Sequence, residues 1–154
     1  MYIVVVALTM LILPLVSIAI DLGFHPGASS VDFSIGRWFV FWGVGVRLFL
    51  AGTRQFIQPT FTAREIFHTT SDEILPIVRE IGLANLSASV VALLSLAIPS
   101  FVLPAAISGA IYYGAAGVLH IAEPNRSRNE NIAMVSDLGI AAVLIVFVAS
   151  SWLG

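Results

Sequence analysis

Long apolar stretches recur along this chain and are separated by short polar segments. A helix needs about 20 mostly apolar residues to cross the hydrocarbon core of a bilayer. Stretches of that length cover about residues 2–20, 35–57, 74–98, 101–122 and 134–153. The pattern therefore predicts an all-α integral membrane helical bundle of about five transmembrane helices, forming a single transmembrane domain over residues 1–154.

Two polar segments carry a capping-box pattern, in which a Ser or Thr is followed three residues later by Glu or Gln. Thr70-x-x-Glu73 is expected to open the third membrane helix. Thr62-x-x-Glu65 indicates a short surface helix over residues 62–68. The first apolar stretch has no basic segment before it and no small-x-small motif after it, so we do not expect a cleaved signal peptide.

Composition supports a membrane protein. The chain has 154 residues, of which 58% are hydrophobic and 10% are charged, and its mean hydropathy is +0.99. A soluble domain has roughly 45–50% apolar and about 25% charged residues. The absence of cysteine excludes disulfides, thiolate metal sites and cysteine nucleophiles. A net charge of −2 argues against binding of nucleic acid.

Arginine placement predicts an orientation for the bundle. All seven cationic residues are arginines, and the second and fourth connections carry Arg64, Arg126 and Arg128. The first and third connections contain none. Because loops rich in Lys and Arg stay in the cytoplasm, the N-terminus is expected to be cytoplasmic.

Several ionisable residues interrupt the predicted membrane helices, where a charge costs several kcal/mol unless it is paired or hydrated. Arg47 lies near the middle of the second helix, too far from either end to reach water easily. Arg54 follows on the same helical face. Gly45 and Gly52 make a parallel pair that would let a neighbouring helix approach closely.

The predicted topology places most of these polar residues in the cytoplasmic half of the bilayer, as a funnel that narrows toward the middle of the membrane. We expect a ligand-binding pocket there, formed by Arg47, Arg54, Gln55, Glu80, Asn85, Tyr113, His120 and Asp137. No catalytic motif is recognised, so whether the chain is an enzyme stays open. No metal site is specified by the spacing, although Glu80, His120, Glu123 and Asp137 include metal-ligating types. No cofactor is identified either.

A purely structural interpretation competes with this one. Arg47 could pair with Glu80 or Asp137 only to fix helix packing, because buried ion pairs often serve specificity rather than stability. A lone Asn or His in a membrane helix is commonly an interhelical hydrogen bond. For Tyr113, ordinary helix packing is favoured over a role in binding.

The second half of the chain resembles a family of small bacterial multi-pass membrane proteins of unknown function, which are distantly similar to the DoxX-like four-helix membrane proteins. The matching residues are Glu80-Ile81-Gly82-Leu83-Ala84-Asn85-Leu86, Phe101 to Pro104, Tyr113-Gly114-Ala115-Ala116-Gly117 with His120, and Asp137. The likeness covers roughly residues 78–140. It implies the bacterial inner membrane as location, and it groups Glu80, Asn85, His120 and Asp137 as one set.

Three functions remain open at this point. The first is binding of a lipid, a quinone or a small organic anion in the inner-leaflet pocket. The second is a proton-coupled carrier or relay, motivated by His120 beside carboxylates and acting as a homo-oligomer. The third is a non-catalytic accessory subunit of a membrane complex, motivated by the short loops and the small-residue stripe Ala105, Gly109, Tyr113, Gly117.

Overall fold

Helices dominate the computed structural model, which describes residues 2–25, 27 and 29–153. Helical residues make up 87% of the chain, and the described residues contain no strand. Helical segments long and apolar enough to span a membrane number five within this part of the chain: Tyr2–Phe24, Val31–Ile57, Asp72–Leu94, Pro99–Ala122 and Arg128–Leu153. The predicted all-α bundle with five membrane helices is confirmed.

The first two spans each contain a π-helical turn. The first span consists of α1 (Tyr2–Ala7), η1 (Leu8–Ile12) and α2 (Leu13–Phe24), and the second of α3 (Val31–Phe39), η2 (Val40–Val46) and α4 (Arg47–Ile57). Pro14 lies two residues after η1. Proline has no N–H, and its ring would clash with the carbonyl of Met10 in a regular α-helix. The wider turn of η1 is where the helix accommodates Pro14.

The third and fourth spans begin with a short 3₁₀ turn, and the fifth is a single α-helix. They are η3 (Asp72–Ile74) with α6 (Leu75–Leu94), η4 (Pro99–Phe101) with α7 (Val102–Ala122), and α8 (Arg128–Leu153). The short helix α5 (Pro59–Glu65) connects the second span to the third. Its predicted start at Thr62 is wrong, because Pro59 occupies the first turn, where a missing N–H costs nothing.

Helix caps explain where the prediction missed two other starts. The third span is capped by Ser71 rather than Thr70: Ser71 Oγ accepts from the Glu73 N–H at 3.3 Å. The fifth span begins at Arg128 rather than near residue 134. Before it, Ser127 Oγ accepts from the Glu130 N–H at 3.2 Å, and Glu130 Oε2 accepts from the Ser127 N–H at 2.7 Å. This reciprocal capping box lengthens α8 toward its polar start.

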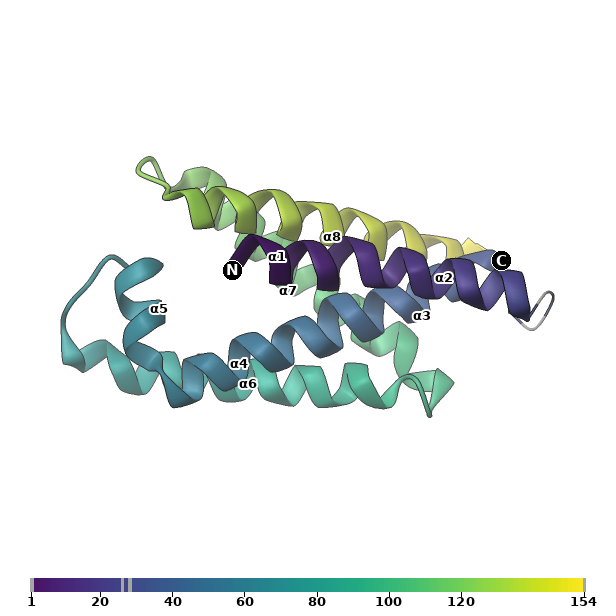
Figure 1. Cartoon of the computed structure of the whole chain (residues 1–154), viewed down its shortest axis with the longest axis horizontal. Coiled ribbons are helices and arrows are strands. Elements are labelled where there is room, and N and C mark those ends of the chain that lie inside the picture. Colours follow the sequence, from purple (N-terminus) through teal and green to yellow (C-terminus); the bar gives the residue numbers. More distant parts are fainter. Residues whose placement is uncertain (1, 26, 28, 154) are drawn as a thin grey trace.

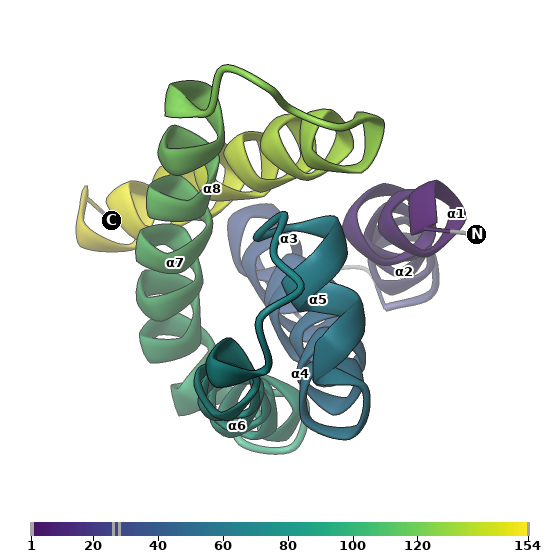
Figure 2. The ribbon, with the colours of Figure 1, turned by 90° about the vertical axis from the view of Figure 1, so that its left-hand side faces the viewer.

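The helices diverge toward one end of the bundle. Figure 1 shows α1 and α8 along one side and α4 and α6 along the other, with α5 at the end where the two sides are furthest apart. Seen from that end in Figure 2, α7 stands at one side of the bundle and its loop to α8 runs across the top. The most extensive helix contacts join α7 to α8 and α4 to α6.

The apolar surface of the first span points outward. Only 22% of its most apolar stretch is buried inside the protein, and Leu11 and Ile20 are about half exposed. In water such a surface would be strongly unfavourable, whereas lipid tails are as apolar as these side chains. Burial and sequence together therefore describe a helix that faces lipid.

Glycines bring the helices close together at defined points. On the second span, Gly45 and Gly52 both face α6, where Gly45 lies against Leu93 and Gly52 against Gly82. The predicted close approach at this glycine pair is confirmed. The stripe of Ala105, Gly109, Tyr113 and Gly117 on α7 is also buried within the chain. That stripe is therefore not available to a partner subunit.

Replacing Gly52 with alanine should destabilise the bundle. The added Cβ would lie 2.6 Å from the Gly82 carbonyl oxygen and 3.0 Å from the Leu86 backbone nitrogen, so the two helices must move apart. We expect a loss of about 1–3 kcal/mol, as for other overpacked sites. Thermal unfolding in detergent measures it. Gly114→Ala is the matched control, because its Cβ would meet only Ala141 at 3.8 Å. Equal stability of the two variants would contradict the prediction.

Candidate functional site

A cavity of about 530 Å³ lies at the end of the bundle that carries α5 and the start of α1. Side chains from α1, α4, α5, α6, α7 and α8 form its wall. The cavity brings together six of the residues that the sequence indicated: Arg47, Arg54, Gln55, Tyr113, His120 and Asp137.

Glu80 and Asn85 do not line this cavity. Glu80 is exposed on the outer face of α6, about 100° around the helix from Ile81, which does face the cavity. Asn85 is buried behind the wall, and its Nδ2 donates to Gln55 Oε1 at 2.8 Å. Asn85 therefore joins α6 to α4 and fixes the side chain of Gln55 at the cavity surface.

Arg47 is the deepest cation of the cavity and the first residue of α4. Its Nη2 donates to the Tyr2 hydroxyl at 3.3 Å, and its guanidinium carbon lies 5.6 Å from the centre of the Tyr2 ring. Its Nε is buried and has no hydrogen-bond partner among the described residues. A buried donor left in this state costs about 1–3 kcal/mol, and more when it is charged.

Asp137 faces the same cavity from α8 and is 9% exposed. It lies nine residues beyond Arg128, the first residue of α8, which places it about 14 Å along the helix. The earlier start of α8 thus puts Asp137 deeper than the sequence suggested. Across residues 2–25, 27 and 29–153, neither Arg47 nor Asp137 has an ion-pair partner within 4.0 Å. Two opposite charges therefore face one cavity without pairing.

Tyr113 packs between helices, as the sequence analysis favoured. Its hydroxyl donates to the Gly43 carbonyl at 2.6 Å, and its side chain is only 3% exposed. Gly43 lies inside η2, and a π turn leaves a carbonyl without its usual helical donor. Tyr113 therefore satisfies that carbonyl and joins α7 to the second span beside the cavity.

The outer part of the cavity is closed by α5. The guanidinium carbon of Arg54 lies 3.4 Å from the centre of the Phe61 ring, a cation–π contact between α4 and α5. Thr62 and Phe67 continue this wall, and His120 lines the opposite side from the last turn of α7. The connection between the second and third spans thus forms part of the site rather than a free loop.

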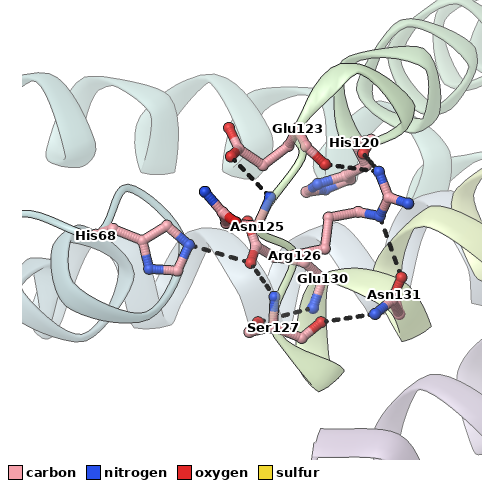
Figure 3. Close-up of polar contacts among 8 residues, drawn as sticks. All are labelled: His68, His120, Glu123, Asn125, Arg126, Ser127, Glu130 and Asn131. Atoms are coloured by element: carbon pink, nitrogen blue, oxygen red, sulfur yellow. Dashed lines mark hydrogen bonds and ion pairs between the residues drawn. The ribbon is translucent and has the colours of Figure 1, made fainter.

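A polar network at the rim ties this connection to the start of α8 (Figure 3). His68 Nε2 lies 3.1 Å from Glu130 Oε2, the same oxygen that accepts from the Ser127 backbone. Arg126 Nη1 donates to the carbonyls of His120 and Ile121 in the last turn of α7 and of Glu123, which caps it. Glu130 and Tyr2 were not among the predicted site residues. The Ser127-x-x-Glu130 capping pattern is the signal that could have found Glu130.

The carboxylates and imidazoles of the site are spread over several helices. Among the described residues, no group of three or more His, Asp or Glu side chains is arranged to hold a metal ion.

These features define a multi-pass helical membrane protein with a cavity at one end of the bundle, lined by apolar side chains and several polar ones. The chain belongs to the Family of unknown function (DUF6790), whose pattern matches residues 4–153. This match covers the first span as well, beyond the part of the chain in which a resemblance was recognised from the sequence. The comparisons gave no match to a curated protein or to a solved structure.

Phenylalanine at position 113 should lower stability. The substitution keeps the ring but leaves the Gly43 carbonyl buried without a donor, which costs about 1–3 kcal/mol. Thermal unfolding in detergent should show the loss. Tyr112→Phe is the matched control, because Tyr112 is 39% exposed. An unchanged midpoint for Tyr113→Phe would show that the hydroxyl does not support the fold.

Proposed function

We propose that this protein binds a small amphipathic anion, with the anionic head group on Arg47. The buried and unpartnered Nε of Arg47 is the observation that carries the proposal. A guanidinium offers five N–H donors in a rigid fork that matches the geometry of a carboxylate or phosphate. Of these donors, only Nη2 makes a hydrogen bond within the described residues, and its partner is a neutral hydroxyl.

The rest of the cavity supports an amphipathic ligand. Tyr2 adds a polar group beside Arg47 and His120 adds one nearer the rim, whereas Leu48, Ile81 and Leu119 contribute apolar wall. Ligand sites of this kind combine a mainly apolar lining with a few polar groups that fix orientation. An apolar tail on the ligand would contact the wall while its head group reaches the arginine.

The side of the membrane follows from the same arginine distribution that predicted the topology. Arg54, Arg64, Arg79, Arg126 and Arg128 belong to the segments at the cavity end of the bundle. We therefore place this end, and the N-terminus with it, on the cytoplasmic side of a bacterial inner membrane. The ligand would then enter from the cytoplasm or from the inner leaflet.

Arg47→Gln should weaken the binding of an anionic amphiphile. The probe is dodecyl phosphate, added to the protein in neutral dodecyl maltoside micelles and followed by native mass spectrometry. A charge-assisted hydrogen bond contributes about 1.5–3 kcal/mol, so the affinity should fall about tenfold or more. The neutral dodecyl maltoside serves as the probe without an anionic head group.

Arg64→Gln is the matched control for this experiment. It removes the same charge from an exposed position on α5 that does not line the cavity. The control should bind dodecyl phosphate like the wild type. Equal binding by wild type and Arg47→Gln, with both folded, would overturn the proposal. If Arg47→Gln does not fold, Tyr2→Phe tests the same head-group site, because it removes the hydroxyl that positions Arg47.

Asp137 favours a second candidate, a proton-coupled carrier or relay. A buried carboxylate that faces the cavity and has no ion-pair partner in the described part of the chain is suited to take up and release a proton. Intramembrane carboxylates and histidines commonly serve in proton relays. His120 lines the same cavity nearer its rim. A chain this short would act as a homo-oligomer in this role.

Asp137→Asn separates the two candidates. If the protein is a proton-coupled carrier, this variant should lose the proton flux into reconstituted vesicles under a pH gradient. A pH-sensitive dye trapped in the vesicles measures that flux. Glu80→Gln is the control, because Glu80 is an exposed carboxylate outside the cavity. Proton coupling would be excluded if the proton flux of the wild type did not respond to the pH gradient, or if Asp137→Asn kept the full proton flux.

A further inference from the structure

A second concave surface lies on the opposite side of α8. It is a groove of about 880 Å³ between the first span and α8, with Phe39 of α3 at its base. Ile3, Val6 and Met10 line it from one side, and Ile132, Val135 and Gly139 from the other. The groove is therefore almost entirely apolar along its length.

The two concave surfaces use different faces of α8. Glu130, Ala133 and Asp137 follow one another at helical spacing and face the polar cavity. Arg128, Ile132, Val135, Gly139 and Val143 form a second series at spacings of three and four, and these face the groove. The groove is thus separated from the cavity by the body of α8.

One end of the groove carries a cation. Arg128 lines the groove, is exposed, and makes no ion pair or side-chain hydrogen bond within the residues that the structure describes. Its neighbour Arg126 differs, because its guanidinium is occupied by the last carbonyls of α7. Asn131 also lines this end, but both polar atoms of its side chain are engaged by Arg126 and Ser127.

The length of the groove fits one leaflet. Ile3 and Leu11 bound it on the first span, about 12 Å apart along the helix, and Arg128 and Val143 bound it on α8, about 22 Å apart. One leaflet has about 15 Å of hydrocarbon, and its head-group region adds about 5–7 Å, in which Arg128 would lie. An acyl chain that runs along the groove would therefore stay within the leaflet whose head groups lie at the level of Arg128.

We propose that this groove binds one anionic glycerophospholipid of the surrounding bilayer, with an acyl chain between the first span and α8 and its phosphate on Arg128. An anionic head group is favoured by charge complementarity, because the cation Arg128 lies at the polar end of the groove. This site is independent of the anion site proposed at Arg47, because the cavity that contains Arg47 lies against the other face of α8. It would hold a lipid against the first span, whose contacts with the rest of the bundle are few.

Gly139 allows the groove to be filled without disturbing the helix. A Cβ added at this residue meets no atom within 4 Å, so a longer side chain extends into the groove. Gly139→Leu should therefore displace the acyl chain, whereas Arg128→Gln should remove the contact with the phosphate. The two variants test the apolar and the charged parts of the site separately.

Native mass spectrometry of the full chain tests the proposal. The protein is released from dodecyl maltoside micelles that contain equal amounts of phosphatidylglycerol and phosphatidylcholine. We expect the wild type to retain one phosphatidylglycerol in preference to phosphatidylcholine. Gly139→Leu and Arg128→Gln should each reduce that retained population at least fivefold. Arg64→Gln should retain it, because Arg64 lines neither the groove nor the cavity.

Three outcomes would overturn the proposal. The first is a wild type that retains no lipid or retains the two lipids equally. The second is undiminished phosphatidylglycerol in both groove variants. The third is a wild-type dimer that Gly139→Leu converts to a monomer, which would assign the groove to a second copy of the chain. If circular dichroism shows that Gly139→Leu does not fold, the phosphatidylglycerol retained by Arg128→Gln is compared with that retained by Arg64→Gln. Equal retention by these two variants would then overturn the proposal.

Discussion

Hydrocarbon offers no hydrogen-bond partner, and this constraint organises the whole bundle. Backbone groups pair within helices, and where a π turn frees the Gly43 carbonyl, Tyr113 supplies the missing donor. Asn85 donates to Gln55 between α6 and α4. Arg47 is the exception, since its buried Nε has no partner in the described residues. An unsatisfied cation at this depth is the feature of the fold that most needs a functional explanation.

The cavity that contains Arg47 lies between two tightly packed helix pairs. The α4–α6 pair closes on Gly52 and Gly82, and the α7–α8 pair includes a close contact at Gly117. Because each pair is held tightly, the space between them is kept at the end where they diverge (Figure 1). The helix α5 and the rim network around Glu130 then cover part of that space, so that the cavity is framed by connections as well as by membrane helices.

The cavity and the groove share α8 but differ in chemistry. The cavity combines unpaired charges of both signs with an apolar wall, as expected for a ligand that must be oriented. The groove is apolar with one free cation at its end, as expected for a lipid that is bound by its chain and selected by its head group.

The sequence by itself determined the five spans, the end at which the polar residues gather, and six residues of the cavity out of the eight predicted, because long apolar runs and intramembrane charges leave few alternatives. The Ser127-x-x-Glu130 pattern indicates the start of α8, but the predicted span began near residue 134. Because α8 begins at Arg128, Asp137 lies further inside the helix than predicted. Only the tertiary structure decided which face each helix presents. Glu80 points outward, Asn85 donates to Gln55, and Arg47 has no ion-pair partner in the part of the chain that the structure describes. Helix rotation and order depend on packing between spans, which a pattern along one chain does not encode.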